Sequence, residues 1–448
     1  MTDLTARLAA HATSVSCEAL PKAVVEQAKQ VIFDEIASAH FGRRSIAGTL
    51  ATRYVDSARG LPEAQVFGSG FKTSAALAAM ANGAAGHGEE IDGAHTAGGH
   101  PGSVVVNAAM ALGEARRKTG ADVIAAVVAG YDVGVRLRWA CGGSFHAREK
   151  LHLHADFLYA LGAAAAAGRL MNLDARAIGH ALALTTLQAN GLYAIYAEQR
   201  HVSKSFCEGL YAHAGISGAQ MAAAGLEGHA DIVGARSGVL EAWGVDGGRD
   251  IVIEGLGRSF SIMNACFKFF NAGFPIQAAL EAALALVRDH AIDAADIGSV
   301  TVAMNPSARR IVDSRAMNNI CLQDMLAAVL LGRGASLGDD PFPAMLSDPR
   351  FRRLRDVITI VDDARFRDDA VNRLGAELTI SRGRAGRVSR VVDHSRGYDA
   401  QGRIDWQDLE QKWRENLGGC DVSRAIAIAR DLEYVEDVSL LAGCFGGP

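Results

Sequence analysis

The densest group of side chains that could carry out chemistry lies in one glycine-rich stretch, HGEEIDGAHTAGGHPG, residues 87–102. Imidazole and carboxylate groups act as general acids and bases, and they also bind iron, manganese or zinc. Residues 101–103 are typical of a helix start, where the backbone favours anions. A solvated surface loop would carry the same residue types, and the spacing matches no recognised metal-ligand motif. The side chains concerned are His87, Glu89, Glu90, Asp92, His95 and His100.

A second group of titratable side chains comes just before an alanine-rich stretch, in KLHLHAD, residues 150–156. Alternate residues of an extended segment point the same way, so His152 and His154 could face one site together. A histidine at such a place is also commonly a hydrogen-bonded residue at the edge of a core. Two histidines beside an aspartate leave both interpretations open.

The scarcity of lysine gives a third signal, because only eight of the 45 basic residues are lysine. Lys204 and Lys268 stand among phenylalanine, cysteine and small residues, unlike most of the others. A lysine at the edge of a core can simply extend its ammonium group to water. A partly buried ammonium group, however, needs an anionic partner from the protein or from a ligand. Together with the histidines, these two lysines would form a cradle for a di- or tricarboxylate.

The composition argues against several classes of protein. The 448 residues carry 45 Lys and Arg against 50 Asp and Glu, and a formal net charge of −5 disfavours nucleic-acid binding. No apolar run reaches the roughly 18 residues of a membrane span, and the first residues lack a signal pattern. The seven cysteines contain no CxxC pair, which disfavours a disulfide framework, a zinc knuckle and an iron–sulfur cluster. We expect a cytoplasmic enzyme that binds neither nucleic acid nor membrane.

The elements that must position these groups are mainly helices. Apolar residues at steps of three and four predict a helix from Pro21 to Ala39. Similar patterns, several of them apolar nearly all round, predict helices over 73–85, 103–117, 121–138, 156–171, 174–188 and 205–225.

The pattern changes after about residue 265, where β-branched residues begin to alternate with others. Two strands are expected at 298–304 and 356–362, and a hairpin at 376–393. Helices over 275–290 and 322–332 lie among them, which indicates an α+β region. The chain then becomes helical again at 406–416 and 421–430, where it could pack back on the first part.

At these residues the chain resembles the MmgE/PrpD family, which includes 2-methylcitrate dehydratase, cis-aconitate decarboxylase and iminodisuccinate epimerase. The resemblance covers most of the chain. Its landmarks are AALAAMANGAAGHGEEIDGAH, GGHPGSVVVNAAMALGEA, GAAAAAGRLMNLD, KSFCEGLYAHAG and the Lys268 segment that ends in AALEAALAL. The first two together are the most specific.

The resemblance implies a mainly α fold. A large all-helical domain would be formed by both chain ends, residues 1–265 and 395–448. A smaller α+β lid domain, residues 266–394, would be inserted between them. The resemblance also implies a homodimer, and an active site between the two domains that uses neither a metal nor an organic cofactor.

The resemblance also assigns roles to ten residues. Those expected to be catalytic are His100, as the leading acid or base, His154, as its partner across the substrate, Asp92 and His95. Those expected to bind the substrate are Glu90, His152, Lys204, Lys268, Cys207 and Gln277.

The chain departs from the family pattern at several of these positions. Counting places the family's second histidine at Leu153, so His152 or His154 must replace it, and we favour His154. Cys207 and Gln277 stand where the family commonly has histidine. In the lid, MNNICLQDMLAAVLLG replaces a stretch that usually supplies an aromatic site residue.

We therefore expect a lyase that dehydrates a small, 2-methylcitrate-like hydroxy-polycarboxylate. The family's reactions share a charge-rich, enolate-like transition state next to a carboxylate, which lysines in a dry cleft stabilise. The alternatives are an epimerase of a small dicarboxylate, a decarboxylase of the cis-aconitate type and an inert carboxylate-binding relative.

Overall fold

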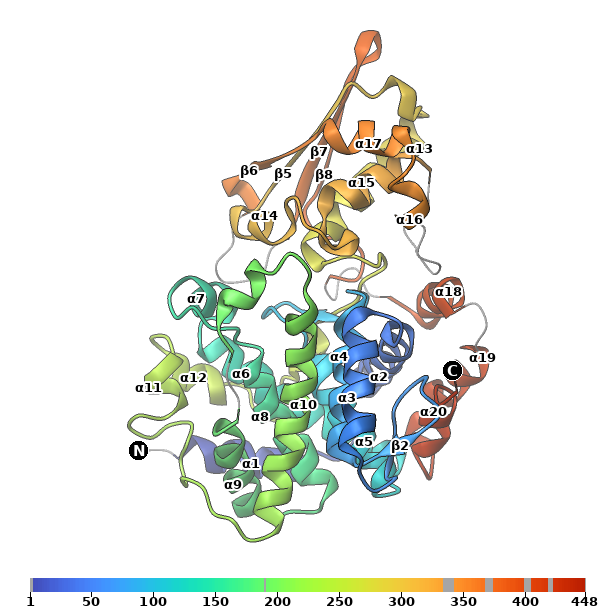
Figure 1. Ribbon diagram of the computed structural model, residues 1–448. Helices are drawn as coiled ribbons and strands as arrows, with labels where there is room; N and C mark the ends of the chain where they lie inside the picture. Colours follow the sequence, from blue (N-terminus) through green and yellow to red (C-terminus); the bar gives the residue numbers. More distant parts are fainter. Residues whose placement is uncertain are drawn as a thin grey trace.

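The computed structural model describes residues 3–188, 191–332, 342–366, 374–398, 404–417 and 422–447. The chain is mainly helical, as expected, and its one larger sheet lies apart from the main helical body (Figure 1). Each helix expected from the residue spacing is present, with its ends shifted by a few residues. Within the described segments, no helix has both the length and the apolar character needed to cross a membrane.

The helical body is built around α10, which packs on both α4 and α8. Alanine and glycine dominate these helices and are buried on nearly every face, so the helices lie close together. The central helices are α4 (Ala75–Gly88), α5 (Pro101–Ala115), α6 (Gly120–Ala140), α8 (Phe157–Leu170) and α10 (Val202–Ala223). Those around them are α1 (Leu4–Ser14), α2 (Lys22–Gly42), α3 (Ile46–Ala58) and α9 (Ala175–Thr186).

The C-terminal helices return to this body and share its hydrophobic core. They are α18 (Trp406–Leu417), α19 (Val422–Arg430) and α20 (Ser439–Gly443), and α18 and α19 pack on α2, on the same side of the body in Figure 1. The contact with α2 includes a buried polar link: Lys412 Nζ and Trp413 Nε1 donate to Asp34 Oδ1, at 2.7 and 2.8 Å. Both chain ends therefore build one core.

The α+β part has a separate hydrophobic core. Its sheet has the strand order β6-β5-β7-β8, in which β5 (Ser299–Met304) runs parallel to β6 (Ile358–Asp362) and antiparallel to β7 (Ala376–Arg382). The expected hairpin pairs β7 with β8 (Gly386–Val392). Buried and partly exposed residues alternate along β5 and β7, so each strand has one face in the core. The helices that share this core are α13 (Gln277–His290), α14 (Pro306–Val312), α15 (Leu322–Leu330) and α17 (Pro349–Asp356).

Two very short strand pairs stabilise irregular segments. One, β1 (Ala64–Gln65) with β2 (Lys72–Thr73), precedes α4. The other joins β3 (Ala94–His95) to β4 (Ala265–Cys266), and so links the polar stretch 87–102 to the segment that carries Lys268. The domain boundaries at residues 265 and 395 stay a prediction.

Candidate active site

The polar stretch 87–102 is buried, so the surface-loop alternative is wrong. It joins the end of α4 to the start of α5, and the β3–β4 pairing covers it. His87 lies in the last turn of α4, and His100 immediately precedes Pro101, the first residue of α5. The helix start predicted at residues 101–103 is therefore present. Two helix ends fix the two histidines at either side of one short loop.

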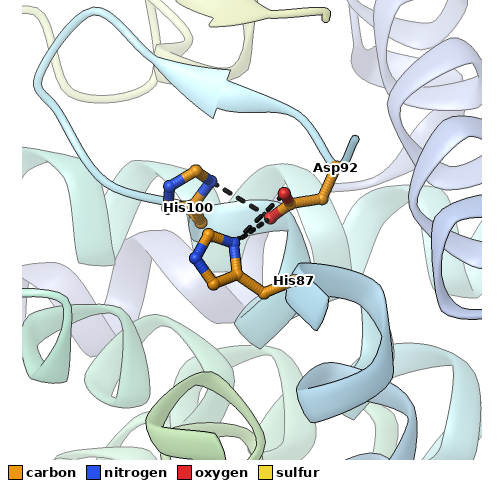
Figure 2. A group of neighbouring side chains, drawn as sticks. All are labelled: His87, Asp92 and His100. Carbon is orange, nitrogen blue, oxygen red and sulfur yellow. Dashed lines mark hydrogen bonds and ion pairs between the residues drawn. The ribbon is translucent and has the colours of Figure 1, made fainter. Parts of the chain in front are cut away.

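The rings of His87 and His100 lie next to each other, with centroids 4.1 Å apart, and the carboxylate of Asp92 contacts both of them from one side (Figure 2). Its carboxylate is 3.0 Å from Nδ1 of His87 and 3.0 Å from Nδ1 of His100. Nδ1 of His100 also lies 2.8 Å from the carbonyl oxygen of Gly93, so that nitrogen must carry a proton in order to donate. In the neutral ring Nε2 then has a free lone pair, which is the form a general base needs.

His87 is not available as a catalytic base, because both of its ring nitrogens are hydrogen-bonded within the protein. Its Nδ1 donates to Asp92, and its Nε2 accepts a hydrogen bond from the ammonium group of Lys204. Burial lowers the pKa of His87 to about 4, although Asp92 acts in the opposite direction. The ring is therefore neutral near pH 7 and connects Lys204 to Asp92.

The two scarce lysines both point inward, onto the same carboxylates. Lys268 is fully buried and donates to Asp92 Oδ1 at 3.1 Å and to the backbone oxygen of Glu90 at 2.9 Å. Nζ of Lys204 lies 3.8 Å from Glu90 Oε1. Glu90 itself has a left-handed backbone, φ 54°, a conformation that costs a residue other than glycine about 1 kcal/mol or more. Lys268 helps to hold Glu90 in this conformation, because it donates to the backbone oxygen of Glu90 and, at 3.4 Å, to its Oε2.

These contacts keep the cluster charged despite its burial. Burial alone would raise the pKa of Asp92, but its interactions with His100, His87 and Lys268 hold it well below its ordinary value. In the same way, Lys204, His87 and Lys268 outweigh burial and hold the pKa of Glu90 well below its ordinary value. Burial would lower the pKa of Lys268, but Asp92 and Glu90 raise it. The site thus contains preformed ion pairs.

A cleft opens onto this cluster, and residues of the helical body and of the α+β part line it together. Its polar lining comes from the helical body: Glu90, His100, Arg148, Tyr196, His201 and Lys204. Its apolar lining comes mainly from the α+β part: Phe274, Pro275, Ala308, Ile311, Val312, Ile320 and Leu374. Two cations and an available imidazole therefore face a space with an apolar wall.

Among the residues that the structure describes, two groups have ligand atoms close enough for a metal ion, all within 4.8 Å of one another within a group: His87, Asp92 and His100, and His154, Asp156 and Glu208. In the first group, Lys268 already donates a hydrogen bond to Asp92, and Lys204 already donates one to Nε2 of His87. In the second, Arg138 lies 3.0 Å from Asp156. Each group would place a divalent ion beside an existing cation, an unfavourable arrangement at low dielectric. The donor sets fit ion pairs better than a metal.

His154 lies behind the cleft, and not across it from His100. It is 1% exposed, and its Nδ1 is 3.3 Å from the hydroxyl of Tyr211. Its Nε2 lies 3.6 Å from Glu208 and 3.7 Å from Asp156. Burial lowers the pKa of His154 to about 3, whereas burial and the charge of Asp156 raise the pKa of Glu208 well above its ordinary value.

Four other expected site residues are placed away from the cleft lining. Both ring nitrogens of His95 bond to backbone groups, of Ser261 and Ala97, which leaves none for a ligand. The amide of Gln277 bonds only to the backbone of residues 269–272. His152 is exposed, and Cys207 is a half-buried thiol whose pKa burial raises to about 12.

Three of the polar side chains that line the cleft have no role in the expected site: Arg148, Tyr196 and His201. His201 was within reach of sequence reasoning, because it stands one helical turn before Lys204 and its Nδ1 lies 3.5 Å from Glu90. Tyr196 lies in the short 3-10 helix η2 (Tyr193–Ala197), for which the sequence shows no periodic pattern. Arg148 lies in α7 (Gly143–Glu149), another short helix.

Comparison with known proteins identifies the class. The MmgE/PrpD N-terminal domain matches residues 6–248 and the MmgE/PrpD C-terminal domain matches residues 270–433. The chain therefore belongs to the MmgE/PrpD family.

Individual relatives resemble the chain to different extents. Cis-aconitate decarboxylase of Aspergillus terreus is 31% identical over 247 residues, which cover 53% of this chain and 48% of that protein, so the chain spans about half the length of this relative. The cis-aconitate decarboxylase-like protein oryM of Aspergillus oryzae is 25% identical over 479 aligned positions, 99% of this chain and 98% of that protein. Mitochondrial 2-methylcitrate dehydratase of Yarrowia lipolytica is 30% identical over 133 residues, 28% of this chain and 25% of that protein.

Proposed function

We propose that the protein is a lyase that acts on a small tricarboxylate without a metal or an organic cofactor. One observation carries the proposal: His100 lines a cleft, and Asp92 and the carbonyl oxygen of Gly93 engage its Nδ1, so that Nε2 is left for a substrate. Lys204 and Arg148 line the same cleft and would bind substrate carboxylates. Lys268 does not line it, so we assign Lys268 to holding Asp92 and Glu90 rather than to binding substrate.

In the proposed reaction, Nε2 of His100 removes a proton from the carbon next to a substrate carboxylate. Asp92 stabilises the imidazolium ion that forms, as a carboxylate paired with a histidine does in other acid–base sites. Lys204 and Arg148 stabilise the negative charge that develops on the carboxylate and carbon. Because the ion pairs exist before the substrate binds, little reorganisation accompanies the step.

We favour dehydration of a 2-methylcitrate-like hydroxy acid as the reaction. Decarboxylation of a cis-aconitate-like acid is the second candidate, since a decarboxylase-like relative matches this chain over 99% of its length. Epimerisation has less support, because His154 does not face the cleft as a second acid–base group. A homodimer and a cytoplasmic location stay predictions.

The test is incubation of the chelator-treated protein with 2-methylcitrate, citrate or cis-aconitate in D₂O, followed by proton NMR. Dehydration appears as loss of the hydroxy acid with formation of an alkene, and decarboxylation as loss of a carboxylate from cis-aconitate. Either result supports the proposal. Deuterium exchange without net product would instead indicate an epimerase, and binding without exchange or product would indicate an inert relative. Activity that chelation abolishes and a metal restores would contradict the metal-free mechanism.

A further inference from the structure

Tyr196 occupies the place between the cleft and the buried His154. Its ring centroid lies 5.4 Å from that of His154 and 5.9 Å from that of His201. Nζ of Lys204 lies 5.6 Å from the same centroid, close enough for a cation–π contact. The ring of Tyr193 stacks on that of Tyr196 with a distance of 4.6 Å between centroids, so these neighbours hold the Tyr196 ring in place. Tyr196 thus lines the cleft at a fixed position beside the main cation of the site.

The hydroxyl group of Tyr196 is available for a ligand. Over the ranges that the structure describes, it makes no hydrogen bond to the protein, although the side chain lines the cleft. The other proton donors in the cleft are already engaged: Lys204 donates to His87, and His201 faces Glu90. His100 is needed as the base. Among the cleft residues described, Tyr196 is therefore the group best placed to supply a proton.

We propose, resting on the lyase function above, that Tyr196 is a catalytic residue that donates the proton opposite His100. It would take the role that the sequence had suggested for His154. It would also supply an aromatic residue from the helical body, where the expected lid aromatic is absent from MNNICLQDMLAAVLLG.

The proton balance of the dehydration is complete with these two residues. His100 takes the proton from carbon, and the electron pair of that C–H bond becomes the second bond of the alkene. The C–O bond breaks with its pair on oxygen, which takes the phenolic proton of Tyr196 and leaves as water. Proton exchange through solvent then returns a proton to Tyr196 and removes one from His100. In a decarboxylation, the same phenolic proton would pass to the carbon that has lost carbon dioxide.

The electrostatic surroundings support a donor rather than an acceptor. Burial raises the pKa of Tyr196 well above its ordinary value, and the charge of Asp156 and the nearby Tyr193 raise it further, while Arg148 acts in the opposite direction. The hydroxyl group is therefore protonated at neutral pH.

The test compares Tyr196→Phe with Tyr193→Phe, which removes the hydroxyl of the stacked neighbour outside the cleft lining. We expect Tyr196→Phe to lower kcat at least about 100-fold, the usual scale for a lost proton donor. KM, citrate affinity by calorimetry and the melting temperature should stay close to wild type, because the ring contacts remain. Tyr193→Phe should keep kcat within about threefold.

Each outcome bears on the inference. If the wild-type protein is active and Tyr196→Phe has the same kcat, the proposed role of Tyr196 is overturned and the lyase proposal stands. A parallel loss of kcat, citrate binding and melting temperature would show a structural role and would also overturn it. A wild-type protein that transforms none of the acids would overturn both proposals together.

Discussion

At the scale of residues, the site depends on one carboxylate. Asp92 joins His87, His100 and Lys268, all within about 3 Å, and so links the end of α4, the start of α5 and the segment after β4. A buried carboxylate with three such partners is stable only while all of them remain. The same contacts that make the site reactive therefore also stabilise the fold.

Sequence reasoning brought the central residues of this cluster together, because scarce lysines and a dense polar stretch are unusual in an alanine-rich chain. It failed where residue type does not distinguish a ligand-binding group from a satisfied core group. His95 and Gln277 are polar and buried, but the backbone engages them. The same holds for His154, because the alternation of side chains along an extended segment does not show which of its two faces lies against a cleft.

The first prediction concerns the buried counter-ion. Lys268→Met should lower the free energy of unfolding by about 3–5 kcal/mol, because it leaves Asp92 and Glu90 without their buried cation. Urea unfolding at pH 7 measures this. Lys22→Met, at the exposed start of α2, is the matched control and should change stability by less than about 0.5 kcal/mol. Equal effects of the two variants would show that the buried ion pairs contribute nothing.

At the scale of elements, close helix packing sets the geometry of the site. Gly209 on α10 faces α4 so closely that an added Cβ would lie 2.1 Å from the carbonyl oxygen of Met80. In the same way, a Cβ added to Gly83 on α4 would lie 3.0 Å from Cα of Gly209. This approach of α10 to α4 places Lys204 against His87. The small residues at this helix crossing therefore help to set the position of Lys204 relative to His87.

The second prediction follows from that crossing. Gly209→Ala should move α10 away from α4, lower the free energy of unfolding by about 1–3 kcal/mol and reduce turnover, since Lys204 lies on the same helix. Gly443→Ala, in α20 where an added Cβ meets nothing within 4 Å, is the control and should change neither. Melting curves and turnover assays measure both effects. A Gly209→Ala variant that matches Gly443→Ala would contradict the packing argument.

The long helices and the larger strands could be predicted from the sequence, because their apolar residues recur with a clear period. The short elements could not. Helices such as α7, α11 (Val239–Trp243) and α12 (Gly248–Ile253) are only two turns or less, and η2 has no periodic pattern at all. Tertiary contacts determine the conformation of such short segments. Two of the missed cleft residues, Arg148 and Tyr196, lie in them.

At the scale of the whole molecule, residues of both the helical body and the α+β part line the cleft. The helical body supplies the charged and titratable lining, and the α+β part supplies most of the apolar lining. The helical body also contains several buried histidines, distributed over different elements. Burial lowers the pKa of His40, His87, His95 and His154 among them, which couples the stability of the protein to pH.

The third prediction is a loss of stability on mild acidification. Burial lowers the pKa to about 4 for His40, His87 and His95 and to about 3 for His154. The unfolded chain takes up these protons near pH 6.5 and the folded chain does not, so stability falls as pH drops from about 6.5 towards 4. The lowered pKa values of Asp92 and Glu90 add a further loss only below about pH 4, where the unfolded chain begins to protonate these carboxylates and the folded chain does not.

Glu35 and Glu208 act in the opposite direction, because burial raises their pKa values and the folded chain keeps their protons at a pH where the unfolded chain does not. The measurement therefore compares variants by urea unfolding at pH 7.5, 6 and 5. His95→Gln should remove about 1 kcal/mol of the loss per pH unit below about pH 6, and His290→Gln, at an exposed position, should remove none. A His95→Gln variant with the same pH dependence as His290→Gln would contradict the prediction.

The central claim is that His100, fixed by Asp92 and facing the cleft, removes the substrate proton. The most direct measurement is turnover of 2-methylcitrate and cis-aconitate by His100→Gln, with citrate affinity measured on the same sample and His290→Gln as control. We predict a loss of turnover of at least about 100-fold with citrate affinity nearly unchanged, and full turnover in the control. Full turnover by His100→Gln would contradict the account.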